Sequence, residues 1–312
     1  MKTIFIVNPS ARNNHALSSW KRFNKQLDPT HSIFLTEKPT DVRRIVSDLV
    51  KQFPNEPLHI IGVGGDGTMN SVISGTIGFE NIVIGYIPSG SGNDFARGYN
   101  WPNSKKEAYT LIRNWTSFED TLSLDSGQFA IKEGPKGYFV NNIGIGFDAH
   151  IAQKANESQL KKWLNKWSLG KLIYPIILCK ETLRFKPFSL SLTVNGKEKR
   201  FDKVWFVTIS NQPYFGGGMK ISPHASPIDG KLDITIVHDL SKWKLLLLFI
   251  SVFFGKHTSF KEVNTYKGEN VKIQCCRQVP VHVDGDSICE IVLENILQVN
   301  VLPSSWKMLK QK

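Results

Sequence analysis

Short apolar runs alternate with longer stretches of helical spacing over the first 120 residues of the chain. Residues 16–27 and 40–53 carry apolar side chains three and four positions apart, which predicts helices, and another helix can start within residues 69–74. Four apolar runs predict strands: Lys2–Val7, 32–36, 58–63 and 81–87. Strands that alternate with helices in this way favour a parallel, doubly wound α/β sheet.

The pattern changes after about residue 121, where short β-rich runs dominate and only residues 151–183 and 241–256 have helical character. We expect strands at 137–143, 189–194, 203–210, 231–237, 270–274, 279–283 and 298–302. This spacing predicts a mostly antiparallel, sandwich-like β domain. The sequence therefore predicts two domains, residues 1–125 and 126–312, and the last segment is a candidate to pack back on the first domain.

The composition is that of a globular protein, with 41% hydrophobic and 21% charged residues among 312. The four cysteines have neither disulfide nor zinc spacing, which favours buried thiols and a reducing, cytoplasmic location. The N-terminus lacks the long apolar stretch and the cleavage site of a signal peptide. A helix over residues 243–255 would span about 20 Å, too short to cross a bilayer, and we expect it to be a buried helix.

The net charge is +12, and it is concentrated between residues 151 and 200, which hold eleven basic and three acidic side chains. A nucleic acid, an anionic membrane surface or a phosphorylated ligand would suit such a surface. No nucleic-acid-binding module is recognisable, so we expect no nucleic acid partner. Five lysines surround two tryptophans in residues 151–171: Lys154, Lys161, Lys162, Lys166 and Lys171, with Trp163 and Trp167. The mixture favours reversible membrane association, although an amphipathic helix with buried tryptophans stays open.

A glycine-rich turn, residues 62–68 (GVGGDGT), lies between an expected strand and an expected helix. Glycines let backbone amides approach a phosphate closely, and the start of a helix favours an anion. Asp66 fits such a loop when Mg²⁺ lies between its carboxylate and the phosphate oxygens. A second polar cluster, residues 88–97 (PSGSGNDFAR), follows the next strand, so both clusters can line one edge of the sheet. Asp94 is a second potential Mg²⁺ ligand there, or a helix cap.

Further motifs follow in order: residues 141–149 (NNIGIGFDA), 216–222 (GGGMKIS), Asp229-Gly230 and Asp284-Gly285-Asp286. With the two loops above and an early Asn8-Pro9, the chain resembles the diacylglycerol kinase catalytic family, which includes sphingosine and ceramide kinases. The resemblance covers nearly the whole chain. It implies an ATP- and Mg²⁺-dependent kinase that phosphorylates a lipid hydroxyl, with a nucleotide-binding first domain and a lipid-substrate second domain.

The resemblance also implies roles for individual residues. Contacts to ATP are expected from Asn8, Pro9, Ser10, Ala11, Arg12, Thr36, Gly65, Asp66, Gly67, Thr68, Met69, Asn70, Ser71 and Ser91. A structural Mg²⁺ is expected on Ser226, Asp229 and the backbone carbonyl of Lys231. The catalytic base falls on Asp284 or Asp286, and we favour a shared arrangement in which one accepts the proton.

The chain departs from the family pattern at a few positions. Residues 10–14 replace a glycine-containing turn, Ser71 stands where glutamate is usual, and Asp286 replaces the commoner glutamate. An NAD kinase shares the GGDGT turn, and a catalytically silent nucleotide- or lipid-binding regulator is a further alternative. The identity of the lipid and a homodimer both stay open.

Overall fold

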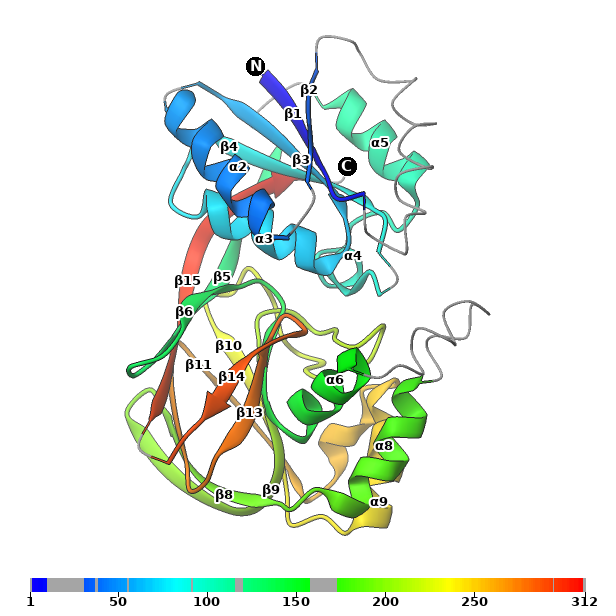
Figure 1. The fold of residues 1–312 in the computed structure, drawn as a ribbon, viewed down its shortest axis with the longest axis vertical. Coiled ribbons are helices and arrows are strands. Elements are labelled where there is room, and N and C mark those ends of the chain that lie inside the picture. The colour runs from blue at the N-terminus through cyan, green and yellow to red at the C-terminus, as the bar shows by residue number, and fades with distance from the viewer. Residues whose placement is uncertain are drawn as a thin grey trace.

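The computed structural model describes residues 2–9, 31–36, 39–54, 56–90, 92–115, 120–157, 173–293 and 295–310. Two bodies are stacked along the long axis of the molecule, the N-terminal body above the C-terminal one in Figure 1. Each has its own cluster of buried apolar side chains. The helix expected at 16–27 and most of the Lys/Trp-rich segment lie outside the described residues.

Parallel strands form the N-terminal sheet in the order β2-β1-β3-β4. Their bounds are β1 (Lys2–Val7), β2 (Ser32–Leu35), β3 (Leu58–Gly64) and β4 (Ile82–Pro88). Every residue of β3 and β4 is buried, because helices cover both faces of the sheet. The helices are α2 (Pro39–Gln52), α3 (Asp66–Thr76), α4 (Asp94–Gly98) and α5 (Lys105–Asn114). The predicted doubly wound domain is confirmed.

Two glycines, one in β3 and one in β4, show which helices cover the two faces of the N-terminal sheet. A Cβ on Gly62 would meet Met69 of α3, whereas a Cβ on Gly85 would meet Ile61 of β3 and Ile112 of α5. Because successive side chains of a strand point to opposite faces, α3 and α5 lie on opposite sides of the sheet. This arrangement leaves the carboxyl ends of β3 and β4 as the open edge.

Antiparallel pairing dominates the C-terminal body, as predicted. Its strands are β5 (Thr121–Ile131), β6 (Lys136–Phe139), β7 (Asn142–Gly146), β8 (Phe188–Val194), β9 (Lys197–Ser210), β10 (Leu232–His238), β11 (Val263–Gly268), β12 (Asn270–Cys275), β13 (Val279–Val283), β14 (Asp286–Ile291) and β15 (Ile296–Leu309). Helices α6 (Phe147–Glu157), α8 (Ile173–Arg184) and α9 (Lys242–Val252), with the 3₁₀ turn η2 (Lys256–Ser259), lie together on one side of this body (Figure 1).

Strand β15 runs through both bodies. It pairs with β12 and β5, and its end pairs in parallel with β4 at Met308 and Ile84. Trp306, Met308 and Leu309 are buried in the N-terminal cluster. The predicted strand covered only residues 298–302, because the following Pro-Ser-Ser sequence is typical of a loop. Strand β5 likewise crosses the expected boundary at residue 125.

Three sequence expectations differ from the structure. The strand expected at 137–143 is divided into β6 and β7, because the backbone between them turns its amides toward Asp284. Helix α9, expected to be buried, exposes a row of large apolar side chains. The four cysteines are free, but Cys179 and Cys276 are exposed. Within the described part of the chain, no helix combines the length and the apolarity needed to span a membrane.

Candidate functional site

The turn that follows β3 is the first helical turn of α3. Gly65 is its N-cap residue, and the amides of Thr68 and Met69 donate to the Gly65 carbonyl. A Cβ on Gly64 would lie 2.3 Å from Oγ1 of Thr68, so this position has no room for a side chain. The Asn8 amide nitrogen donates to the same Thr68 oxygen over 3.2 Å. The end of β1 is thereby fixed beside the glycine-rich turn.

The loop that follows β4 packs directly on this turn. The Ser89 amide donates to the Gly64 carbonyl over 2.7 Å. A Cβ on Gly90 would lie 2.7 Å from the Gly65 Cα, so the two loops meet glycine to glycine. Asn93 takes a left-handed conformation (φ 56°) and turns the chain into α4. The two polar clusters therefore share one edge, as expected; Ser91 lies outside the described residues.

Asp66 lies at this edge with one carboxylate oxygen held and the other facing the second loop. Its Oδ1 accepts a hydrogen bond from the Phe95 amide over 3.0 Å. Burial and the neighbouring Asp94 carboxylate raise the pKa of Asp66 to about 6. The Oδ2 atoms of Asp66 and Asp94 lie 3.0 and 3.8 Å from where a Gly92 Cβ would be. Two carboxylates that repel each other at one loop are ligands that suit a divalent cation, and Oδ2 of Asp66 is the oxygen with no hydrogen bond from the described residues.

The carboxylate of Asp94 accepts more hydrogen bonds than the carboxylate of Asp66. Arg97 donates to its Oδ1 over 2.9 Å, and the Gly217 amide donates to its Oδ2 over 2.6 Å. Gly217 has φ 87°, which a residue with a side chain rarely adopts. Burial raises the pKa of Asp94, and these donors oppose the rise. Asp94 therefore joins the N-terminal body to the loop between β9 and β10.

Asp284 makes a second junction between the bodies. Its Oδ1 accepts from the amides of Asn141 (2.9 Å) and Asn142 (2.8 Å), and its Oδ2 accepts from the Val140 amide (3.0 Å). The Asn70 side chain of α3 also donates to Oδ2. Four donors occupy the carboxylate, so it is a poor acceptor for a substrate proton.

Asp286 has a different environment two residues later. No hydrogen bond to its carboxylate is present among the described residues, and its Oδ2 lies 4.0 Å from where a Cβ on Gly67 would be. Desolvation raises the pKa of this carboxyl, and nearby His282 opposes the rise. Asp286 therefore faces the glycine-rich turn across the boundary between the bodies with its carboxylate free. Of the two aspartates expected to share the reaction, only Asp286 has a carboxylate that is free to accept a proton among the described residues.

A buried pair that sequence reasoning missed supports the turn from behind. The Gly285 amide donates to Nδ1 of His282 over 3.3 Å, and Nε2 of His282 lies 3.4 Å from Oδ2 of Asp148. The Phe215 ring stacks on the imidazole at 4.7 Å. Asp148 belongs to the NNIGIGFDA motif, which was the available signal; His282 had none.

The remaining expected nucleotide contacts divide into three groups. Asn8, Pro9, Gly65, Gly67, Thr68 and Ser71 lie at or beside the turn after β3. The Thr36 hydroxyl donates to the Val7 carbonyl and is buried, the Met69 side chain lies in the apolar core, and Asn70 is bonded to Asp284. The Thr36 hydroxyl is therefore occupied by a carbonyl at the carboxyl end of β1, and the Met69 side chain faces the apolar core. Ser10, Ala11 and Arg12 lie outside the described residues.

The expected structural metal ligands lie in the C-terminal body, away from the loops. Asp229 Oδ2 is 2.7 Å from Nζ of Lys267, which is also 3.3 Å from Asp233 and 3.4 Å from the His224 carbonyl. Among the described residues, no cluster of three His, Cys, Asp or Glu side chains is placed to hold a metal. Because an ammonium group already lies between these oxygens, the fit of Ser226, Asp229 and Lys231 to Mg²⁺ is poor.

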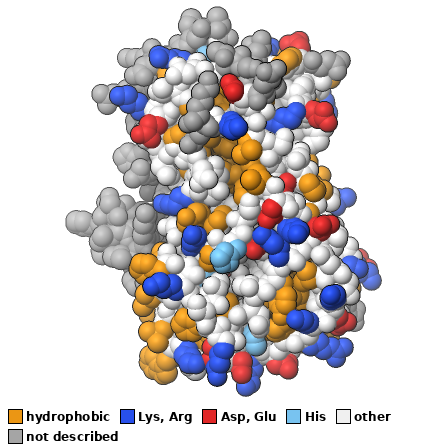
Figure 2. Space-filling model, turned by 180° about the vertical axis from the view of Figure 1, so that it is seen from behind, with side chains coloured by type: hydrophobic (Ala, Val, Ile, Leu, Met, Phe, Trp, Pro, Cys, Tyr) orange, Lys and Arg blue, Asp and Glu red, His pale blue; other side chains and the backbone are white. Residues whose placement is uncertain are grey.

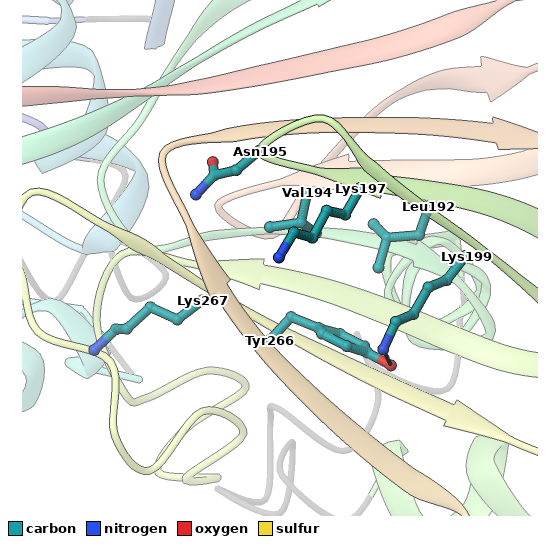
Figure 3. Close-up of a pocket in the computed structure, with 7 residues that line it drawn as sticks. All are labelled: Leu192, Val194, Asn195, Lys197, Lys199, Tyr266 and Lys267. Carbon is teal, nitrogen blue, oxygen red and sulfur yellow. Dashed lines mark hydrogen bonds between the residues drawn. The ribbon is translucent and has the colours of Figure 1, made fainter.

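A cavity of about 270 Å³ lies apart from these loops, on β8, β9 and β11 (Figure 3). Its walls are Leu192, Val194, Asn195, Lys197, Lys199, Tyr266 and Lys267. Lys199 extends over the Tyr266 ring at 4.7 Å. None of the described residues that are expected to bind ATP or to act as base lines this cavity.

Comparisons with known families agree with the division into two bodies. Residues 2–122 match the diacylglycerol kinase catalytic domain. Residues 141–310 match the domain described as YegS C-terminal NAD kinase beta sandwich-like. The predicted fold class, α/β followed by an antiparallel β sandwich, is confirmed.

Individual relatives cover nearly the whole chain. The chain is 33% identical to "Putative lipid kinase YtlR" of Bacillus subtilis, over 90% of this chain and 92% of the relative. It is 29% identical to a diacylglycerol kinase of Mycobacterium tuberculosis, over 81% and 77% of the two chains. A crystal structure of a "putative diacylglycerol kinase" from Bacillus anthracis superimposes with a TM-score of 0.75 at 21% identity, over 99% and 97% of the two chains.

Proposed function

Because this chain belongs to the family of diacylglycerol and related lipid kinases, we propose that it transfers the γ-phosphoryl group of ATP to the hydroxyl of a membrane lipid. Diacylglycerol is the first candidate acceptor, since a relative that matches 81% of this chain is named diacylglycerol kinase. The reaction forms a bond between the lipid oxygen and the γ-phosphorus and breaks the bond to ADP. The hydroxyl proton needs an acceptor.

The free carboxylate of Asp286, opposite the glycine-rich turn, is the observation that carries this proposal. The turn offers backbone amides and the positive end of α3 to the triphosphate. Asp286 faces Gly67 across the boundary, so a hydroxyl aligned with the γ-phosphorus lies next to a proton acceptor. A raised pKa makes Asp286 a stronger base than an ordinary aspartate.

The other carboxylates have supporting roles in this proposal. Asp94 and Asp284 hold the two bodies in register, because each accepts hydrogen bonds from both of them. Asp66 presents its Oδ2 to the triphosphate site and would hold Mg²⁺ there, with Asp94 beside it. When bound, Mg²⁺ would neutralise charge on the triphosphate oxygens.

The test is product analysis with γ-labelled ATP and a panel of acceptors: diacylglycerol, monoacylglycerol, ceramide, a sphingoid base, phosphatidylglycerol and NAD. We expect label in a lipid product only when Mg²⁺ is present, and its loss in Asp286→Asn. Label in NAD alone would favour the soluble-kinase alternative. No labelled product with any acceptor, from protein that binds ATP, would favour the silent regulator.

A further inference from the structure

Helix α9 exposes a row of large apolar side chains. The exposed fractions are 76% for Trp243, 61% for Leu247, 63% for Ile250 and 71% for Phe254, a residue just beyond the helix end. Positions 243, 247, 250 and 254 follow one face of a helix. We call these four residues the outer row. Globular proteins rarely expose so many adjacent large apolar side chains without a partner.

The opposite face of α9 anchors it in the C-terminal core. Leu245, Leu248 and Val252 are fully buried there. The outer row is therefore not needed to hold the helix in place. Helix α9 is apolar on both faces, and the described core covers only one of them. The other face is suited to contact with an apolar environment outside the C-terminal body.

Helix α8 extends this surface. Leu183, 63% exposed, lies near its end, and the Leu183 carbonyl accepts a hydrogen bond from Lys242 at the start of α9 over 2.7 Å. Figure 2 shows hydrophobic side chains gathered on the side of the C-terminal body where α8 and α9 lie, with basic side chains among them. The exposed basic residues of α8, α9 and the following η2 are Lys180, Arg184, Lys242, Lys244 and Lys256.

Charge decides which partner fits. Two of these basic side chains have acidic partners: Arg184 lies 3.7 Å from buried Glu181, and Lys244 lies 2.7 Å from buried Glu262. Among the described residues, Lys180, Lys242 and Lys256 form no ion pair, and α9 itself carries no acidic side chain. A second copy of this chain would bring lysines against lysines, in a protein with a net charge of +12. An anionic bilayer instead attracts the lysines and accepts the apolar row. Tryptophan beside lysine is typical of the bilayer interface.

We propose that the outer row and Leu183 form the surface on which this protein docks on an anionic bilayer, with α9 lying in the interface. The helix is too short to span it. The reason for docking rests on the proposed function, because a kinase whose acceptor lies in the bilayer must bind the bilayer to reach it. Packing links the surface to the site: α9 contacts α8, α8 contacts α6, and α6 contacts β13 and β14. Asp286 is the first residue of β14.

The experiment is flotation of the full chain with vesicles of equal phosphatidylglycerol and phosphatidylcholine, without ATP. The test variant is Leu247→Ser/Ile250→Ser/Phe254→Ser, and the matched control is Phe79→Ser/Val292→Ser/Leu293→Ser, which removes exposed apolar side chains elsewhere. We expect the test variant to bind roughly 100-fold more weakly. The control should bind like the parent, and both variants should keep the parent's Tm.

Other outcomes separate the explanations. Equal vesicle binding by parent and test variant overturns the inference. So does a parent dimer, seen by analytical ultracentrifugation, that the test variant loses without losing vesicle binding; the surface is then an interface between copies. Parent protein that binds vesicles through the outer row but phosphorylates no lipid contradicts the proposed function and leaves the docking surface standing. Parent protein that phosphorylates a lipid but does not bind vesicles contradicts the docking surface and leaves the proposed function standing.

Discussion

The side-chain amide of Asn70 in α3 donates a hydrogen bond to the carboxylate of Asp284 in the turn between β13 and β14. The same carboxylate accepts from the backbone between β6 and β7. One side chain thus fixes the distance between the glycine-rich turn and the turn that carries Asp286. Asp284 thus has a structural role and Asp286 has a free carboxylate. We therefore expect substitutions of the two aspartates to have different effects.

Asp286→Asn should lower the turnover number about 10²- to 10⁴-fold, because the amide cannot accept the hydroxyl proton. ATP affinity should stay near the parent's and Tm should not fall, since the carboxylate has no hydrogen-bond partner among the described residues and desolvation disfavours its charged form. Turnover, ATP binding and thermal melts check this. Asp286→Glu keeps a carboxylate and should retain most activity. Turnover of Asp286→Asn within a few-fold of the parent would place the base elsewhere.

Asp284→Asn should instead destabilise the protein. The amide retains one acceptor oxygen, so its NH₂ group would face backbone amides that are themselves donors. We expect a loss of about 2–4 kcal/mol and a Tm lower by about 5 °C or more. Denaturant unfolding measures the free energy, with Asp286→Asn as the matched control. Equal stability of the two variants would contradict the assignment of separate tasks.

Asp66→Asn should abolish turnover and raise stability. Burial raises the pKa of Asp66 to about 6, so the folded protein binds a proton there that the unfolded chain releases near pH 4. The parent's stability should therefore fall as pH rises from about 4 to 6, relative to the variant, and the gap should stay constant above pH 6. Its size is about 1–2 kcal/mol, reduced from the full linkage value by solvent screening.

Unfolding at pH 4, 5, 6 and 7.5 in EDTA checks this sign. A Tm for Asp66→Asn below the parent's at pH 7.5 would show that the carboxylate stabilises the fold. Retention of more than about a tenth of the turnover at saturating Mg²⁺ would make a metal-linked role untenable.

Lys267→Met should turn a cluster of two carboxylates and one ammonium group into a metal site. The ammonium lies between Asp229 and Asp233, so its removal leaves two carboxylates uncompensated and should cost about 1 kcal/mol. We expect Mg²⁺ to raise the Tm of the variant, while EDTA leaves that of the parent unchanged. A parent whose Tm falls in EDTA would instead favour the structural Mg²⁺ expected on Ser226, Asp229 and Lys231. Lys231→Met is the control, because its side chain makes no contact with these carboxylates.

The sequence predicted the features that depend on local pattern. Continuous apolar runs predicted β3 and β4, and glycines at their ends predicted an anion site, because both signals lie within a few residues. It could not separate Asp284 from Asp286, since one glycine divides them and only contacts from 70 and 140–142 distinguish them. The end of β15 was missed because its pairing partners are remote. Helix α9 was expected to be buried because an apolar run does not reveal how much of its surface the fold covers.

The path of β15 also bears on how the chain reaches its native state. Its Trp306, Met308 and Leu309 complete a core whose other strands, β1 to β4, are synthesised first. When all four of those strands of the nascent chain have left the ribosome, these three side chains have not yet been synthesised. The apolar core of the N-terminal body therefore stays partly uncovered until the C-terminal body has been made. Because of this topology, we expect the protein to need chaperones while it is being translated rather than after it has folded.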